Sequence, residues 1–220
     1  MSSVLICFAV SSEATPFKRL LKASHLNDVQ VLVTGMGREN ASRAAAAALA
    51  SLTPNLVLTC GFAGGLNPEL RAGCLLWAGA SDPRLINCLT LAGAREAKFL
   101  CADQVATTAS EKARLRQTHS ADAVEMESAA ILQLCHAQRI PCATLRIVLD
   151  EAGEDLPLDF EKVMGPGREI SPVKLAVAVV MAPGKIPALI QLGRRSSAAA
   201  MKLAETIAAV VKAWRGAPPT

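Results

Sequence analysis

The chain has 220 residues, a hydrophobic content of 51%, an aromatic content of 3% without any Tyr, and a formal net charge of +4. This length suits one domain with a sizeable core, which Ala, Leu, Val and Ile must build. The basic residues are scattered and stacking aromatics are scarce, which argues against nucleic-acid binding. Because no run of 18 uninterrupted apolar residues occurs, we expect no membrane-spanning helix and no stable membrane insertion.

The seven cysteines form no CxxC pair, and the three histidines show no ligand spacing. We therefore expect neither a metal site nor a disulfide framework, and interpret the cysteines as small buried residues of a cytoplasmic protein. The opening stretch MSSVLICFAVSSEATPF has no basic residues before its apolar run. This pattern favours a buried strand over a signal peptide.

Short apolar runs alternate with helical segments over the first 150 residues. The expected strands are Val4–Val10, Val29–Val33, Leu56–Thr59, Cys74–Ala80 and Ala143–Leu149, with a strand pair near Cys88–Leu91 and Ala97–Cys101. The expected helices begin near Thr15 and span 41–52, 109–117 and Glu127–Gln138. Because the strands are apolar throughout, we expect a sheet covered by helices on both faces, an α/β fold. No boundary divides the chain, so 1–220 is treated as one domain.

Beyond Asp150 the sequence becomes polar and rich in Pro and Gly, and we interpret 151–171 as a loop. Whether this loop closes over a substrate stays open. Three further helices are expected, over about 172–182, 186–195 and 197–214. The apolar stretches within 172–192 are typical of core helices, and an open apolar binding face is the alternative.

Two glycine-rich segments follow strands, where ligands bind in such sheets. TGMGREN places backbone amides at a helix start, which attracts anions, although a plain strand-to-helix turn has the same composition. CGFAGGL has three glycines within five residues, which would let backbone lie against a flat ligand or form a packed turn.

Two acidic segments complete the candidate site. In VEMES one carboxylate could accept hydrogen bonds from a vicinal diol, or both could favour the start of a helix. TLRIVLD ends a strand in Asp150, which burial could turn into a proton donor or which could cap the next element. Arg146 in that strand could be the partner of a buried acid.

These segments, in this order, resemble the nucleoside phosphorylase superfamily, including the methylthioadenosine/S-adenosylhomocysteine nucleosidases, over about residues 4–155. The segments that carry the resemblance are Glu13, VTGMG, LTCGFAGGLNPELRAG, ATTASEKARL, ADAVEMESAA and LRIVLDEAGEDLP. The stretch APGKIPALIQLGRRSSAAA is also similar to a hopanoid-associated phosphorylase subgroup. The resemblance implies a three-layer α/β/α domain with a mixed central sheet, in a homo-oligomer. It also implies an enzyme that cleaves a purine N-glycosidic bond without a metal or redox cofactor.

The resemblance also assigns roles. Asp150 matches the acid that protonates the leaving purine, and Glu13 matches the glutamate that activates water. Glu127 matches the glutamate that holds the ribose hydroxyls, beside Met126, which would pack against the sugar, whereas Glu125 would be structural. The residues that would line the nucleoside site are Gly61, Phe62, Ala63 and Gly64. The candidate phosphate contacts are Gly35, Gly37 and Arg38.

Three positions depart from the family pattern. Leu149 replaces the Ser that usually precedes the acid, whereas Thr59 and Phe62 replace residues with which many phosphorylases contact phosphate. The motif residues favour hydrolysis, the C-terminal resemblance favours phosphorolysis of an adenosylated hopanoid, and phosphate stays open as a co-substrate.

Two other classes of protein stay open. A nucleoside-binding protein with impaired catalysis would explain Leu149 and Phe62. A protein that binds a membrane surface through its C-terminal helices would bind liposomes in a salt-sensitive way. The Arg194–Arg195 pair, however, is too small a basic cluster to anchor a protein by charge alone.

Overall fold

The structure is a computed structural model that describes residues 3–24, 28–165 and 171–216. The strands are β1 (Ser3–Phe8), β2 (Val29–Val33), β3 (Pro54–Gly65), β4 (Leu75–Ala78), β5 (Arg95–Glu96), β6 (Phe99–Cys101), β7 (Ala123–Glu125) and β8 (Cys142–Asp150). The helices are α1 (Ser11–Ala23), α2 (Arg38–Ser51), α3 (Pro83–Leu91), α4 (Ala109–His119), α5 (Ser128–Ala137), α6 (Phe160–Val163), α7 (Pro172–Met181), the 3₁₀ turn η1 (Pro183–Lys185) and α8 (Ile186–Gly216).

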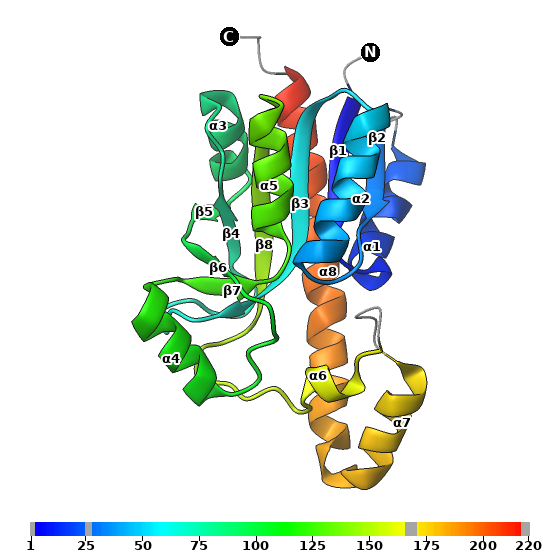
Figure 1. The fold of residues 1–220 in the computed structure, drawn as a ribbon, viewed down its shortest axis with the longest axis vertical. Helices are drawn as coiled ribbons and strands as arrows, with labels where there is room; N and C mark the ends of the chain where they lie inside the picture. The colour runs from blue at the N-terminus through cyan, green and yellow to red at the C-terminus, as the bar shows by residue number, and fades with distance from the viewer. Residues whose placement is uncertain (1–2, 25–27, 166–170, 217–220) are drawn as a thin grey trace.

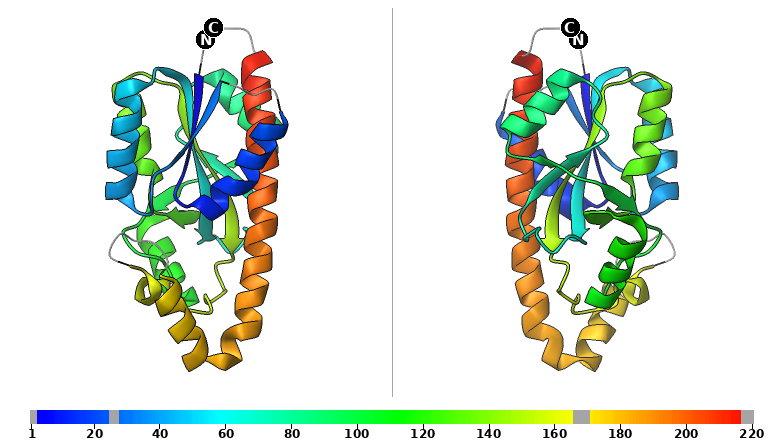
Figure 2. Two further views of the ribbon diagram at one scale, coloured as in Figure 1. Left: turned by 90° about the vertical axis from the view of Figure 1, so that its right-hand side faces the viewer. Right: turned by 90° about the vertical axis from the view of Figure 1, so that its left-hand side faces the viewer.

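The strands form one mixed sheet in the order β2-β1-β3-β8-β4-β5. β2, β1, β3 and β8 run parallel, whereas β4 runs antiparallel to β8. β7 pairs with the end of β3 in antiparallel fashion and also pairs with β6. Helices α2 and α5 cover one face of the sheet, and α1, α3 and α8 cover the other (Figure 1 and Figure 2). The expected three-layer α/β fold is therefore confirmed.

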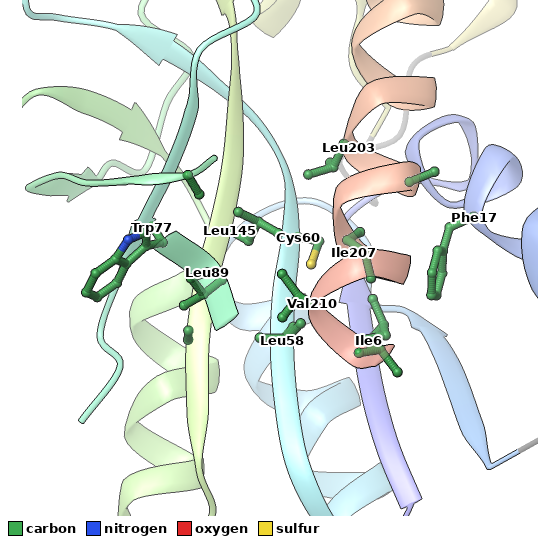
Figure 3. Packing of buried hydrophobic residues seen from close by; sticks show 14 of the residues in the cluster. Ile6, Phe17, Leu58, Cys60, Trp77, Leu89, Leu145, Leu203, Ile207 and Val210 are labelled. Carbon is green, nitrogen blue, oxygen red and sulfur yellow. The ribbon is translucent and has the colours of Figure 1, made fainter. Parts of the chain in front are cut away.

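Both faces of the central strands are buried. Along β1, Ile6 packs in the cluster that includes Ile207 of α8, whereas Leu5 and Cys7 pack in the cluster that includes residues of α2 and α5. Figure 3 shows the first of these clusters between the sheet and α8. Burial on both faces explains why these strands are apolar throughout. Five of the seven cysteines are buried, as expected for small apolar side chains.

Two predictions for the first half of the chain were wrong. β3 does not end at Thr59 but continues to Gly65, so the glycine-rich segment is part of a strand. Cys88–Leu91 is the second half of α3 and not a strand. The Asp82 carboxylate accepts a hydrogen bond from the Arg84 N–H, and Pro83 occupies the first helical turn, so the sequence DPR caps this helix.

The prediction of two separate helices over 186–195 and 197–214 was wrong, because one helix, α8, covers both ranges. It is continuous from Ile186 to Gly216, although a break near 196 was expected. The Ser196 and Ser197 hydroxyls donate to carbonyl groups four residues earlier, so these polar side chains bond within the helix and do not end it. The interpretation of 172–192 as core helices was also wrong, because none of the described side chains from 173 to 198 is buried.

Candidate active site

Glu13 lies in the first turn of α1, directly after β1, and is buried. Its Oε1 accepts a hydrogen bond from the Phe62 N–H of β3 at 2.9 Å, whereas Oε2 has no hydrogen-bond partner among the described residues. Burial raises the pKa of Glu13 to about 7, although the nearby Arg146 guanidinium acts to lower it. A carboxylate with such a pKa and an unengaged oxygen can accept a proton near neutral pH.

Gly61 allows Glu13 and Arg146 to approach the backbone of β3. A Cβ atom at Gly61 would lie 2.6 Å from Arg146 Nη1 and 3.0 Å from both carboxylate oxygens of Glu13. No side chain fits there without displacing one of the two charged groups. The first glycine of CGFAGGL is therefore required by the close approach of two charged side chains.

Arg146 on β8 is the central cation of the site and is buried. Its Nη2 pairs with Glu125 Oε2 at 2.6 Å, lies 3.6 Å from Glu127 Oε2, and donates to Thr59 Oγ1 at 3.3 Å. The prediction that Arg146 pairs with a buried acid is confirmed. Thr59, at a position where many phosphorylases carry an Arg, here contacts the guanidinium of Arg146.

The hydrogen-bonding capacity of the Glu125 carboxylate is used by neighbouring residues of the protein. Its carboxylate accepts hydrogen bonds from the N–H and hydroxyl of Ser128, both at 2.8 Å, in addition to the Arg146 pair. Burial acts to raise the pKa of Glu125, but Arg146 and these hydrogen bonds outweigh it and hold the pKa below its ordinary value. The structural role expected for Glu125 agrees with these contacts, which leave Glu127 as the carboxylate with capacity for a ligand.

Glu127 stands between β7 and α5, as the residue before the first turn of α5. Its Oε1 accepts a hydrogen bond from the Gly37 N–H at 2.9 Å. Burial raises the pKa of Glu127, against the lowering effect of Arg146. The neighbouring Met126 is also buried. Glu127 thus contacts both the TGMGREN turn, through Gly37, and the Arg146 guanidinium.

Asp150 ends β8 and forms an ion pair, through Oδ2, with the ammonium group of Lys112 on α4. Lys112 is fully buried, and its Nζ also donates to the carbonyl oxygens of Glu151 at 2.9 Å and Glu154 at 2.7 Å. Burial raises the pKa of Asp150, and Lys112 opposes this increase. The carboxyl group of Asp150 is therefore buried, and Lys112 is its ion-pair partner among the described residues.

Lys112 is the residue of this site that the sequence interpretation did not single out. It lies in ATTASEKARL, within a helix that begins with a complete capping box formed by Thr108 and Glu111. The capping box was readable from the sequence and marks the start of α4. The fold alone brings Lys112 to Asp150, because the two residues are 38 positions apart.

The glycine-rich end of β3 passes between the two groups of acids. A Cβ at Gly61 would touch Glu13, whereas a Cβ at Gly64 would lie 3.4 Å from Asp150 Oδ2. Three strand residues span about 10 Å, which is close to the length of a nucleoside. Of the residues between them, Phe62 is half-buried and Ala63 is buried. This stretch of β3 thus separates Glu13 and Glu127 at one end from Asp150 at the other.

Two of the candidate phosphate contacts, Gly37 and Arg38, bind other groups of the protein. The N–H of Gly37 already donates to Glu127. Arg38 is exposed, and its Nη2 donates to the Cys101 carbonyl at 3.3 Å and lies 3.9 Å from Asp103. Gly35 has a φ of +85°, so it forms the turn that a glycine favours. The structure therefore brings Gly37 to the acids but not Arg38.

The acids of this site are not arranged as metal ligands. Within the ranges that the structure describes, no group of three or more His, Cys, Asp or Glu side chains is placed to hold a metal ion.

Known proteins with similar sequences are nucleosidases. An aminodeoxyfutalosine nucleosidase of Campylobacter jejuni is 28% identical over 219 residues, which cover 78% of this chain and 95% of that protein. A 5′-methylthioadenosine/S-adenosylhomocysteine nucleosidase of Tolumonas auensis is 29% identical over 172 residues, which cover 63% of this chain and 75% of that protein. Enzymes with these names cleave N-glycosidic bonds.

Solved structures share the fold. The crystal structure of a Campylobacter jejuni 5′-methylthioadenosine/S-adenosyl homocysteine nucleosidase aligns with a TM-score of 0.72 and 21% identity, covering 96% of this chain and 99% of that one. The corresponding enzyme from Neisseria meningitidis aligns with a TM-score of 0.71 and 20% identity over the same shares of the two chains. The family profile of the Phosphorylase superfamily matches residues 19–81 and 80–168. On the evidence of this match, which spans more than half of its length, the chain belongs to the Phosphorylase superfamily.

Proposed function

We propose that this protein hydrolyses the N-glycosidic bond of an adenine nucleoside that carries a 5′ substituent. The observation that carries the proposal is the placement of the acids around the glycine-rich end of β3. Glu13 lies at Gly61 and Asp150 at Gly64, and Glu127 lies 3.6 Å from the Arg146 guanidinium that also approaches Gly61. Relatives named for 5′-methylthioadenosine and S-adenosylhomocysteine support a purine nucleoside with a 5′ group as the substrate.

Each acid has a separate task in this reaction. Breaking the bond between C1′ and N9 leaves positive charge on the sugar and negative charge on the base. Asp150 would give a proton to the leaving purine, and Glu127 would hold the ribose hydroxyls. Glu13 would take a proton from the attacking water through its unengaged oxygen. Carboxylates beside the sugar favour a transition state with oxocarbenium character, as they do in glycosidases.

The charge of the site supports water over phosphate as the nucleophile. Glu13, Glu125 and Glu127 surround the single guanidinium of Arg146, which leaves a net charge of −2 when all are ionised. Such a site repels a phosphate dianion, since like charges interact strongly where water is excluded. The Gly37 amide that could bind phosphate instead donates to Glu127. Phosphorolysis would require Gly35, Gly37 and Arg38 to rearrange around the anion.

The experiment measures release of the purine base from adenosine, 5′-methylthioadenosine, S-adenosylhomocysteine and inosine, with and without phosphate. The free sugar and its 1-phosphate, each with the 5′ group of the substrate, are detected separately, because hydrolysis gives the first and phosphorolysis the second. We expect free sugar, no requirement for phosphate, and a preference for adenine nucleosides with a 5′ group.

The test variant is Asp150→Asn, and its control is Glu151→Gln, which removes the carboxylate of the next residue. We expect Asp150→Asn to lower kcat by about 10²- to 10⁴-fold while nucleoside binding persists, and Glu151→Gln to stay close to wild type. Unchanged turnover in Asp150→Asn would show that Asp150 is not the acid. Nucleoside binding without base release in the wild type would indicate the catalytically impaired binding protein instead.

A further inference from the structure

Exposed apolar side chains gather on one projecting part of the molecule, which we call the apolar hairpin (residues 171–194, from α7 through η1 into α8). The exposed large hydrophobic residues in it are Val173, Val177, Val180, Met181, Ile186 and Ile190. On α7 their exposed fractions range from 57% to 80%. Elsewhere in the described residues, only Leu91 and Met201 belong to this class. Contiguous apolar surface of this kind marks an interaction site.

None of the described side chains of the apolar hairpin is buried. α7 and the helical segment that begins at Pro183 meet at a bend of 102°, and together they project beyond the end of the sheet (Figure 1 and Figure 2). Val173, Val177 and Val180 follow a spacing of four and then three residues, so they lie on one side of α7. The match to the Phosphorylase superfamily ends at residue 168, before this hairpin begins.

The charged residues within the sequence of this region have a single sign. Between residues 171 and 204 the sequence contains five Lys or Arg residues and no Asp or Glu. Lys174 donates to the Met164 carbonyl, and Arg195 pairs with Glu154. Lys185 and Arg194 are exposed and form no salt bridge with a described acidic residue. Lys185 also lines a pocket with four acidic residues from outside this range, Glu111, Asp155, Asp159 and Glu161. The surface thus combines apolar side chains with cations that an anionic surface would neutralise.

We propose that the apolar hairpin docks on the surface of an anionic lipid bilayer, with its apolar side chains in the interface and Lys185 and Arg194 at the lipid phosphates. Helices that expose apolar side chains beside Lys and Arg residues bind in the plane of the interface, where both kinds of side chain find a partner. Among the described residues no single helix is long and apolar enough to cross a bilayer, and only the sharply bent pair 173–181 and 183–216 meets that criterion jointly.

A second copy of this chain fits the hairpin less well. A twofold interface through the hairpin would bring the same patch of both copies together, so the cations of both hairpins would share one interface. No acidic residue between 171 and 204 is available to neutralise them. An anionic lipid surface provides the missing charge without this repulsion.

Docking would turn the candidate site towards the bilayer. The apolar hairpin projects from the same end of the molecule at which the parallel strands end (Figure 1). Arg195 of α8 holds Glu154, whose carbonyl oxygen in turn binds Lys112, the partner of Asp150. If the proposed function holds, a nucleoside with an apolar 5′ group would reach the site from the lipid phase.

The test is flotation of the full-length protein with vesicles of phosphatidylcholine alone or of phosphatidylcholine with phosphatidylglycerol. We expect at least tenfold stronger partitioning to the anionic vesicles, and weaker partitioning as salt rises from 50 to 500 mM, because the Debye length shortens. The variant Val177→Asp/Val180→Asp should lose at least tenfold in partitioning. Leu91→Asp, which changes an equally exposed apolar residue on α3, should partition like wild type.

Circular dichroism and thermal unfolding confirm that each variant is folded. Absence of wild-type binding to anionic vesicles, or equal binding of Val177→Asp/Val180→Asp, would overturn the proposal. A wild-type oligomer that dissociates in this variant and does not bind vesicles would assign the hairpin to a second copy. Base release from soluble nucleosides, measured on the same samples, tests the proposed function separately, since vesicle binding does not depend on turnover.

Discussion

Glu13 is an acid whose environment disfavours its charged form. Burial raises the pKa from 4.5 to about 7, although Arg146 and the Phe62 N–H favour the carboxylate and Glu127 disfavours it. Since the pKa is higher in the folded than in the unfolded state, ionisation of Glu13 destabilises the fold. The loss of stability begins as pH rises above about 4.5 and is complete above about 7. At one pKa unit per 1.36 kcal/mol, the whole effect is about 3 kcal/mol.

The variant Glu13→Gln lacks this ionisation. We expect its free energy of unfolding, relative to wild type, to rise by about 3 kcal/mol between pH 4.5 and 8, measured by urea denaturation. Glu39→Gln, which replaces an exposed glutamate on α2, is the control and should parallel wild type. A pH-independent difference between Glu13→Gln and wild type would mean that Glu13 has an ordinary pKa.

Lys112 acts on the reaction through Asp150, so it is a positioning residue. Its ammonium group stabilises the ionised carboxylate, and its removal should raise the pKa of Asp150 further. In Lys112→Met we expect the alkaline limb of the kcat/KM profile to move up by about 1 to 3 pH units, because the protonated acid persists to higher pH. Lys98→Met removes an exposed lysine that also donates to a carbonyl, and should leave the profile unchanged. A lower rate with an unshifted profile would give Lys112 a structural role only.

At the scale of elements, α8 carries a glycine in its interior that the fold does not require. A Cβ at Gly193 would meet nothing within 4 Å. Because glycine loses more backbone entropy than alanine in a helix, Gly193→Ala should stabilise the protein by about 1 kcal/mol and raise Tm by roughly 2–4 °C. Gly61→Ala is the contrasting variant, since its Cβ would meet Arg146, and we expect it to lower Tm. Thermal unfolding of both variants checks this, and a fall in Tm for Gly193→Ala would contradict it.

At the scale of the whole molecule, α8 extends from the buried core beside the sheet to the exposed hairpin. At about 1.5 Å per residue its 31 residues extend about 46 Å, so the helix reaches from the sheet face to the tip of the hairpin. Ile207 in its second half is fully buried against the sheet (Figure 3), whereas no residue from Ile186 to Ala198 is buried. Truncating a buried side chain of α8 should therefore destabilise the protein, whereas truncating an exposed side chain of the hairpin should not.

We expect Ile207→Ala to lower the free energy of unfolding by about 2–5 kcal/mol, measured by urea denaturation, because it leaves a cavity in the core. Val177→Ala on the hairpin should change it by less than about 0.5 kcal/mol. A large loss of stability in Val177→Ala would show that another surface covers the hairpin in solution.

Some of these features were readable in the sequence. The apolar runs of β1 and β8 predicted a sheet covered on both faces, because only such a sheet buries every side chain of a strand. Asp150 was singled out because an acid at the end of a buried strand lies at the edge where parallel strands end, whereas the role of Glu13 was implied by the family resemblance. The helix α3 was readable in the DPR cap but was missed.

The sequence by itself determined the layers of the fold and the acids at the strand ends, because local periodicity and strand boundaries depend on neighbouring residues. Only the tertiary structure decided that Lys112 pairs with Asp150, that Arg146 is surrounded by three glutamates, and that the glycine-rich segment continues β3. These contacts join residues far apart in the chain. The same holds for the apolar hairpin, because an apolar helix reads alike in the sequence whether or not another layer covers it, and the fold leaves this one uncovered.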